Sequence, residues 1–265
     1  MPKRPQPAPD FVVGHAAGLW NANPDAWRRL VRSVIDQDVA GVPVSVLVLT
    51  ETTQLTPWKP GDWNIFHDGP KGDTGRDECA ITWDTAVWEA VDKGWAEPLT
   101  ARTFRLDDGR PRPRVHGIIQ PLRHRALGRV VPVIGLHPPS GTDGGNALKT
   151  NDRARIAVDV LVGRRRLKKR LRKQYPGCQI VETADENVNQ FKAWARQLLE
   201  KAGGVAVWTA KRLPGRGTHR GGRLIDGMRF TRGLRLIKAR VLDRVKPFDH
   251  NPIAAAFRFR RRRKS

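Results

Sequence analysis

The sequence has few cysteines and no long hydrophobic run, and each shortage excludes a class of protein. Cys79 and Cys178 are the only cysteines, and they stand far apart without CxxC spacing or a neighbouring histidine. This argues against a disulfide scaffold or a zinc ribbon and favours a reducing, intracellular setting. The longest apolar stretch, residues 42–49, is far shorter than the ~20 residues that cross a bilayer. The proline-rich amino end has no apolar signal-peptide core, so we expect neither a membrane span nor export.

Acidic residues are also scarce. Forty-nine Lys and Arg stand against 26 Asp and Glu, so the formal net charge is +23. The surface must be positive whatever the fold, which favours a polyanionic partner. Residues 205–265 hold 18 basic residues and only three acids, namely Asp226, Asp243 and Asp249. Each of these acids is therefore conspicuous.

The composition otherwise predicts a globular chain. Nine tryptophans, eight phenylalanines and a hydrophobic fraction of 39% argue against disorder, which is typical of chains with few aromatic residues. No Gly-rich linker divides the chain, so one α/β domain over residues 11–257 is the economical interpretation. Residues 1–10 are expected to form a flexible proline-rich lead-in. Residues 258–265 form a basic tail, either disordered or a nucleic-acid arm.

Hydrophobic patterns predict the main elements. Asn23 before Pro24 is a capping pair that precedes an apolar helical face ending near Ile35. Residues 42–49, β-branched and apolar on both faces, are typical of a buried strand. Further strands are expected at 79–83, 129–136, 177–183, 205–208, 224–230 and 251–257, and further helices at 151–173 and 188–202.

The helix expected over residues 151–173 ends in a strongly basic segment. Apolar residues Ile156, Val160, Leu167 and Leu171 share one face, and eight of the ten residues 164–173 are basic. Such a segment is either a solvated helix end that complements the macrodipole or a contact for a phosphate backbone. The candidate nucleic-acid contacts are Arg164, Arg165, Arg166, Lys168 and Lys169 here, together with Arg212, Arg216 and Arg220.

Polar residues follow or flank several of the expected strands. Strand ends rimmed by loops are where side chains from distant positions converge on one pocket. Carboxylates and carboxamides are ligands suited to Mg²⁺ or Mn²⁺, and histidines can contact a phosphate or protonate a leaving group. The residues concerned are Asn21, Asn23, Glu51, His137, Asp185, Asn187, Asp226, Asp249 and His250.

These residues occur in six short motifs that together resemble the endonuclease/exonuclease/phosphatase superfamily, which includes DNase I and exonuclease III-type enzymes. In order along residues 20–252, the motifs are Trp20-Asn21-Ala22-Asn23, Thr50-Glu51-Thr52, Leu136-His137-Pro138, Ala184-Asp185-Glu186-Asn187, Ile225-Asp226-Gly227-Met228 and Phe248-Asp249-His250-Asn251-Pro252. The sequence departs from the family pattern at Ala184, Glu186 and Phe248, where the family has Gly, an apolar residue and Ser. These departures bear on substrate preference and rate more than on the metal site.

The resemblance implies a four-layer sandwich in which two mixed β-sheets pack face to face and are flanked by helices. It also implies a role for each polar position. Glu51 resembles the principal Mg²⁺ ligand, assisted by Asn21 and by Asn23 or Asp249. Asp185 resembles the residue that orients or deprotonates the attacking water, and Asn187 the one that steadies the phosphoryl oxygens. His250 resembles the phosphate-contacting histidine that Asp226 orients and keeps cationic, and His137 the second histidine of the DNase I branch.

Local alternatives exist for several of these residues. Asn23 and Asn187 can each cap a helix, Glu51 can be an ordinary loop carboxylate, and Asp249 with His250 can form a turn. Asp226 inside an apolar stretch is harder to explain structurally, because an inward charge is costly unless it is paired. The other histidines, His15, His67, His116, His124 and His219, are assigned no function.

The functional hypothesis is a Mg²⁺- or Mn²⁺-dependent nuclease or phosphodiesterase that hydrolyses DNA by in-line attack of water. Two alternatives remain: a phosphatase of inositol lipids or other small phosphate esters, and a nucleic-acid-binding relative without turnover. The expected partner is nucleic acid, with no membrane and no obligate protein partner. An intracellular bacterial or phage setting is compatible with the composition.

Overall fold

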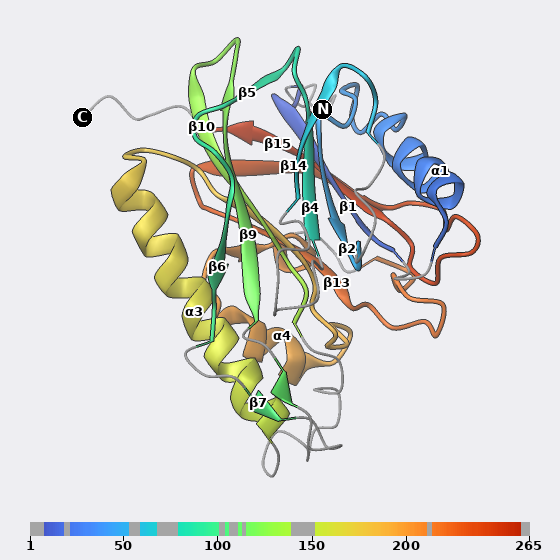
Figure 1. The fold of residues 1–265 in the computed structure, drawn as a ribbon, viewed down its shortest axis with the longest axis vertical. Coiled ribbons are helices and arrows are strands. Elements are labelled where there is room, and N and C mark those ends of the chain that lie inside the picture. Colours follow the sequence, from blue (N-terminus) through green and yellow to red (C-terminus); the bar gives the residue numbers. More distant parts are fainter. Residues whose placement is uncertain are drawn as a thin grey trace, which may run out of the picture.

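The computed structural model describes residues 8–18, 22–52, 59–67, 79–100, 104–105, 111–112, 115–138, 152–210 and 214–260. Two mixed β-sheets dominate it (Figure 1). The first sheet has the strand order β14 (Leu234–Val241), β15 (Ile253–Phe259), β1 (Phe11–Ala17), β2 (Val46–Thr50), β4 (Cys79–Asp84) and β3 (Trp63–His67). The second has the order β12 (Val205–Ala206), β13 (Asp226–Phe230), β11 (Val181–Asp185), β10 (Arg129–Leu136), β9 (His116–His124) and β5 (Trp88–Ala90), with β6 (Trp95–Pro98) also on β9. Strands β7 (Phe104–Arg105) and β8 (Pro111–Arg112) pair separately.

Each sheet contains one parallel pair, and that pair sets the position of the strand ends. β1 runs parallel to β2, and β10 runs parallel to β11. Parallel neighbours end at the same edge of a sheet, so the residues that follow them in the chain emerge side by side. Among the described strands, the other pairings are antiparallel, including β11 with β13, in which Asp185 lies opposite Asp226.

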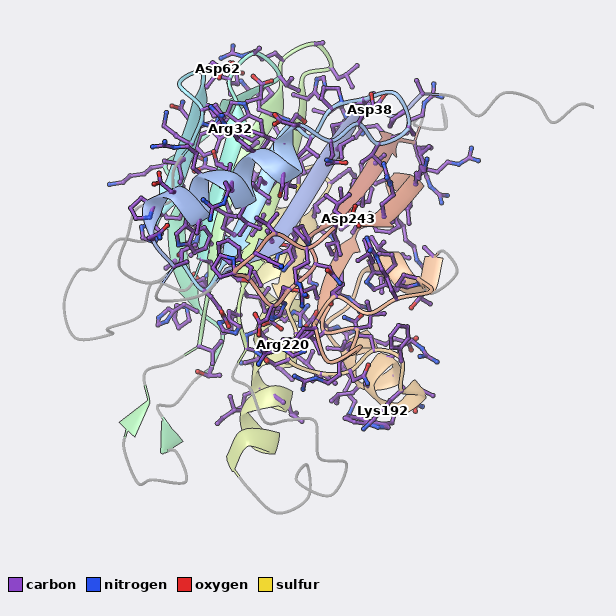
Figure 2. All side chains as sticks on the ribbon, turned by 90° about the vertical axis from the view of Figure 1, so that its right-hand side faces the viewer. Arg32, Asp38, Asp62, Lys192, Arg220 and Asp243 are labelled. Atoms are coloured by element: carbon purple, nitrogen blue, oxygen red, sulfur yellow. The ribbon has the colours of Figure 1, made fainter. Side chains whose placement is uncertain are left out.

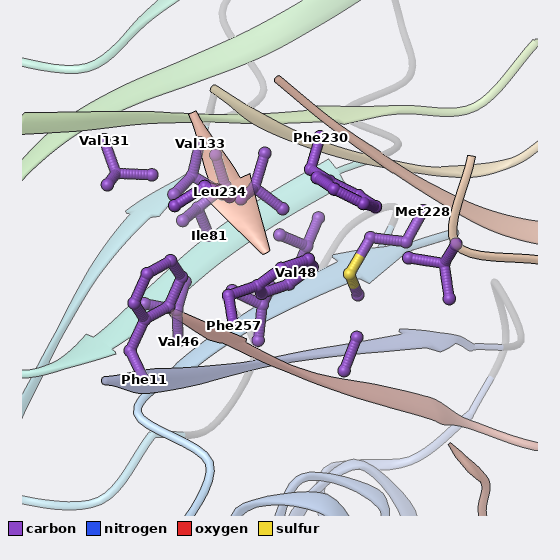
Figure 3. Packing of buried hydrophobic residues seen from close by; sticks show 14 of the residues in the cluster. Phe11, Val46, Val48, Ile81, Val131, Val133, Met228, Phe230, Leu234 and Phe257 are labelled. Atoms are coloured by element: carbon purple, nitrogen blue, oxygen red, sulfur yellow. The ribbon is translucent and has the colours of Figure 1, made fainter. Parts of the chain in front are cut away.

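The two sheets pack face to face through apolar side chains. Val46 and Val48 of β2 belong to the same buried cluster as Val131 and Val133 of β10 (Figure 3). Period-two alternation sends Leu47 and Leu49 to the opposite face of β2, where they pack with α1. Both faces of this strand are covered, which explains why its sequence is apolar throughout.

Helices cover the outer faces of both sheets. α1 (Pro24–Ile35) packs on the first sheet, and α3 (Asp152–Gln174) packs on the second (Figure 1). Of two shorter helices, α4 (Ala193–Glu200) packs through Leu199 against Leu161 of α3, and α5 (Val207–Ala210) contacts β12 and β13. Helix, sheet, sheet and helix form the four-layer α/β sandwich predicted from the sequence, and the predicted fold class is confirmed.

Several element predictions need correction. A strand is expected from the sequence over residues 205–208, but β12 ends at Ala206 and α5 begins at Val207. β9 and β14 are not among the expected strands, since β14 carries a register shift between Leu236 and Lys238 that breaks the alternating pattern. β15 extends to Phe259, two residues beyond the expected end of the domain. Within the described residues, no helix combines the length and apolarity needed to span a membrane.

Candidate active site

The site lies at one rim of the sandwich, where strands of both sheets end. Glu51 follows β2 in the first sheet, whereas His137 follows β10 and Asp185 ends β11 in the second. His137 Nε2 is 3.7 Å from Glu51 Oε1 and 3.5 Å from Asp185 Oδ2. One ligand atom from each of the three residues lies within 4.8 Å of the others. Packing of the sheets therefore creates a cluster that neither sheet contains alone.

Asp226 at the start of β13 joins two histidines from the first-sheet side of the rim. His250 Nδ1 is 2.8 Å from Asp226 Oδ2, and His15 Nε2 of β1 is 3.0 Å from Asp226 Oδ1. The backbone N–H of Asp226 donates to Thr218 Oγ1. All three ionisable side chains are buried, so the carboxylate is satisfied by imidazole groups instead of by water.

Asp226 and His250 stabilise each other's charged forms. Burial by itself raises the pKa of Asp226, but attraction to His250 and hydrogen bonds from His15 and His250 outweigh it, so the pKa lies well below its usual range. Burial likewise opposes the charged form of His250, yet the Asp226 carboxylate raises the pKa of His250 to about 10. His250 is thus an imidazolium at neutral pH, with its Nε2 3.8 Å from Asp185 Oδ2.

The two carboxyl groups near His250, those of Glu51 and Asp185, have raised pKa values. Burial and the charge of Asp185 raise the pKa of Glu51 to about 7, against the opposing effect of His137. Burial and the charge of Asp226 raise the pKa of Asp185 as well. Oxygen ligands crowded together and partly desolvated are a donor set that a hard divalent cation would satisfy. The residues present therefore fit a Mg²⁺ or Mn²⁺ ion held by Glu51 and Asp185.

Asn187 closes the same cluster from the loop after β11. Its backbone N–H donates to Asp185 Oδ1, and its amide Nδ2 donates to the carbonyl of Pro138 at 2.9 Å. The same Nδ2 lies 3.0 Å from His137 Nε2. Asn187 has a φ of 50°, and Glu51 has a φ of 58°. Asn enters the left-handed region readily, but for Glu it is unfavourable, and such strain is typical of functional sites.

Asp249 lies at the outer side of the cluster beside a histidine that the sequence did not single out. Its Oδ1 is 3.9 Å from His250 Nε2, and its Oδ2 is 3.3 Å from His219 Nε2. Burial and the charge of His250 lower the pKa of His219. No local sequence pattern marks His219 or His15 as a site residue, because each comes near the site only through pairing of segments that are distant in the sequence. Their spacing to Asp226 and Asp249 in the sequence is irregular.

Asn23, a predicted metal ligand, is not part of the cluster. Asn21 and Arg212 lie outside the described residues. Asn23 is exposed, and its side chain accepts a hydrogen bond of 2.8 Å from the backbone N–H of Ala26. It is the N-cap of α1, so the capping alternative accounts for Asn23 without a metal.

The predictions for Arg164 and Lys168 as nucleic-acid contacts are wrong. Both side chains are buried beneath α3, with Arg164 only 1% exposed. Arg164 binds Glu186 through two hydrogen bonds of 2.7 and 2.8 Å and also binds Glu182, which Lys168 contacts as well. A signal was present in the sequence, because Arg164 fills the gap of seven residues between Val160 and Leu167 on the apolar face. These cations neutralise buried acids and cannot reach a phosphate.

The remaining basic candidates are exposed. Arg165, Arg166 and Lys169 lie on the outer face of α3, and Arg220 lies in the loop before β13. Arg216 is exposed too, but it donates to Asp243 at 2.9 Å and to the Val241 carbonyl. Figure 2 shows Arg220 toward one end of the molecule and Arg32, Asp38 and Asp62 toward the other. Arg220 also lies close to the cluster in space, since its backbone N–H donates to the Asp249 carbonyl.

The fold is the α/β sandwich also seen in solved structures described as endonuclease/exonuclease/phosphatase proteins. The structure is similar to the human Nocturnin catalytic domain with bound sulfate, with a TM-score of 0.68 at 15% sequence identity over 94% of each chain. A Bacteroides thetaiotaomicron mannosyl-6-phosphatase gives a TM-score of 0.64 at 14% identity, over 94% of this chain and 100% of that chain.

D. rerio TDP2 complexed with a single-strand DNA product gives a TM-score of 0.60 at 9% identity, over 93% of this chain and 98% of that chain. No protein-family model and no curated protein matches the sequence. At these identities the similarities establish the fold, and they confirm the resemblance predicted from the six motifs at that level.

Proposed function

We propose that this protein is a divalent-metal-dependent hydrolase of phosphodiester bonds and that DNA is its substrate. The observation that carries the proposal is the meeting of Glu51, His137 and Asp185, whose ligand atoms lie within 4.8 Å of one another beside protonated His250. Hydrolysis of a phosphodiester needs charge neutralisation, an oriented water and stabilisation of the departing oxygen. The cluster supplies groups suited to each of these tasks.

Each residue has a task that follows from its contacts. Glu51 and Asp185 would hold Mg²⁺ or Mn²⁺, which when bound supplies a Lewis acid for the phosphoryl oxygens. Asp185 can also orient the attacking water and accept a proton from it, since its carboxylate lies beside Glu51, His137 and His250. His250, kept cationic by Asp226, binds a phosphoryl oxygen. Asn187 and His137 lie at the same rim, and we assign Asn187 to the phosphoryl oxygens and His137 to the leaving oxygen.

Charge favours a nucleic acid over a small phosphate ester. A net charge of +23 exceeds what neutralising one phosphate monoester requires, whereas a polymer backbone meets many cations at once. Among the similar structures, TDP2 is complexed with a single-strand DNA product, and one Bacteroides protein is a mannosyl-6-phosphatase. The fold thus hosts both substrate classes, and the basic surface supports the first.

A plasmid-nicking assay tests the proposal. Supercoiled DNA should be nicked in the presence of Mg²⁺, and EDTA should abolish nicking. Asp185→Asn and His250→Ala should each reduce the rate by at least about 10²-fold, because each removes a group needed in the transition state. Asp243→Asn serves as the control, since this acid pairs with Arg216 on the surface.

Two results would contradict the proposal in different ways. Hydrolysis of an inositol phosphate or a sugar phosphate with intact plasmid would identify a phosphatase of small esters. DNA binding that persists in EDTA, with no cleavage of any phosphoester in Mg²⁺ or Mn²⁺, would identify a binding protein without turnover.

A further inference from the structure

The loop that contains His219 is joined to the segment that contains Asp249 and His250. An isolated antiparallel bridge pairs His219 with His250. The N–H of Arg220 donates to the Asp249 carbonyl at 2.8 Å, and the N–H of Asn251 donates to the Thr218 carbonyl. Backbone pairing on both sides of His219 therefore fixes the position of its Cα relative to Asp249.

Hydrogen bonding also determines which nitrogen of His219 carries the proton. The backbone N–H of Gly221 donates to His219 Nδ1 at 3.0 Å. A nitrogen that accepts a hydrogen bond is unprotonated, so the proton of the neutral ring is on Nε2. That nitrogen is 3.3 Å from Asp249 Oδ2 and donates toward it.

Asp249 is consequently held between two imidazole rings of different character. Neutral His219 engages Oδ2, while Oδ1 is directed toward cationic His250 at 3.9 Å. The two rings contact edge to face, with centroids 5.2 Å apart and planes at 88°. Asp249 is about one quarter exposed, so without the bond from His219 its carboxylate would be free to turn toward solvent.

We propose that His219 is a positioning residue that orients the Asp249 carboxylate as a ligand for the divalent cation of this site. The inference rests on the proposed function, which places the divalent cation at Glu51 and Asp185, and it adds Asp249 as a further ligand. Asp249 Oδ1 lies 3.9 Å from His250 Nε2, and the same nitrogen is 3.8 Å from Asp185 Oδ2. Groups that bond to a metal ligand and set its orientation typically affect metal affinity by about 10–100-fold when they are removed. His219 makes this kind of contact with Asp249, and it does so with a tautomer that the Gly221 N–H specifies.

Mn²⁺ binding, measured by electron paramagnetic resonance, tests this inference without relying on turnover. His219→Ala should weaken Mn²⁺ binding by roughly 10-fold. His219→Gln should restore most of the affinity, because the Gln amide nitrogen lies as many bonds from Cα as imidazole Nε2. His219→Asn, whose amide ends one bond earlier, should not restore it.

A double-mutant comparison shows whether His219 acts through Asp249. Asp249→Ala should weaken Mn²⁺ binding, and adding His219→Ala to it should cause little further loss. Equal affinity in wild type and His219→Asn, both folded by circular dichroism, would overturn the inference even if His219→Ala fails to fold. Unchanged binding in Asp249→Ala, or full additivity of the two losses, would overturn it as well.

The result separates this inference from the proposed function. If wild type binds Mn²⁺ with the expected dependence on His219 but cleaves no phosphodiester, the proposed activity is wrong and the positioning role stands. If cleavage occurs and Mn²⁺ affinity is indifferent to His219, the positioning role alone is wrong. A wild-type protein that binds no Mn²⁺ contradicts both.

Discussion

Asp226 shows how one buried carboxylate can define the state of a site. It receives Nε2–H of His15 on one oxygen and pairs with His250 Nδ1 on the other. Its charge outweighs the burial that would otherwise make His250 neutral. Both oxygens of Asp226 contact imidazole groups, and its charge determines whether the neighbouring imidazole of His250 is a cation.

Asp226→Asn should therefore lower the pKa of His250. The wild-type value is about 10, and removal of the carboxylate should lower it by roughly one to three units, because burial then opposes the imidazolium with less compensation. Histidine NMR over a pH titration measures this directly. A pKa of His250 that stays near 10 in the variant would show that Asp226 is not the cause.

The same shift predicts how stability depends on pH. Because the pKa of His250 is higher in the folded state than its ordinary value of 6.5, the stabilisation is complete below pH 6.5 and is lost as pH rises to about 10. Urea unfolding should show a larger loss of stability across this window for wild type than for Asp226→Asn. Parallel pH profiles for the two proteins would contradict the linkage.

At the scale of single elements, the buried face of α3 takes part in a network of ion pairs. Arg164 and Lys168 lie on the buried face of the helix, where Glu182 of β11 and Glu186 meet them. Burial alone would raise the pKa of Glu182, but Arg164 and Lys168 hold it at about 2. Glu186 stands where the family that the motifs resemble has an apolar residue, and Arg164 compensates for that departure. The ion pair between Arg164 and Glu186 also holds the backbone between Asp185 and Asn187 in position.

Arg164→Met should be strongly destabilising. Removal of one partner of a buried ion pair costs about 3–5 kcal/mol, because it leaves unpaired charges in the interior. The free energy of unfolding in urea measures the loss. Arg165→Met, one position along on the exposed face, is the matched control and should change stability by less than about 0.5 kcal/mol.

A double variant tests whether the acid is the source of the penalty. Arg164→Met combined with Glu186→Leu removes an unpaired carboxylate together with its cation. We expect it to be less destabilised than the sum of the two single variants. Strict additivity would show that Arg164 and Glu186 stabilise the fold independently.

At the scale of the whole molecule, the distance between the sheets is set by small and branched residues. A Cβ added to Gly135 of β10 would lie 2.7 Å from Cγ1 of Val48 in β2 and 3.3 Å from Cγ1 of Ile118. Because Glu51 and His137 come from opposite sheets, this separation also controls the site. Glycine at this position allows the close approach that brings them together.

Gly135→Ala should consequently destabilise the protein by about 1–3 kcal/mol and reduce its activity, because overpacking shifts the sheets apart. Thermal or urea unfolding and the nicking assay measure the two effects. Gly215→Ala is the control, since a Cβ there meets no atom within 4 Å. Equal behaviour of the two variants would show that the sheets adjust at no cost.

The contribution of positive charge to DNA binding can be tested by removing three cations from α3 and, separately, three from α1. Arg165, Arg166 and Lys169 on α3, changed together to Ala, should lower the magnitude of the salt slope of DNA binding. The expected decrease is about 0.9 for each phosphate that these three side chains neutralise in the wild-type complex. Arg28, Arg29 and Arg32 on α1, changed in the same way, are the matched control and should leave the slope nearly unchanged. Equal decreases would assign binding to net charge rather than to α3.

The local parts of this architecture were predictable. α1 begins at Pro24 and β10 spans residues 129–136 as expected, because a cap with a period of 3.6 and a run of branched residues each act over a few neighbouring positions. The order of the polar motifs at strand ends likewise led to the correct fold class. For these features the amino-acid sequence alone was sufficient.

Long-range contacts decided the rest. The helical period places Arg164 on the apolar face of α3, but only the fold shows that Glu182 and Glu186 are its partners. His15 is an ordinary strand residue in the sequence, and only the fold places Asp226 opposite it. His219 reaches Asp249 only because a loop pairs with a distant segment. Charge pairing depends on which residues meet in three dimensions, so no short-range pattern identifies the partners. That is why only the packing of two sheets revealed which charges are structural and which face the site.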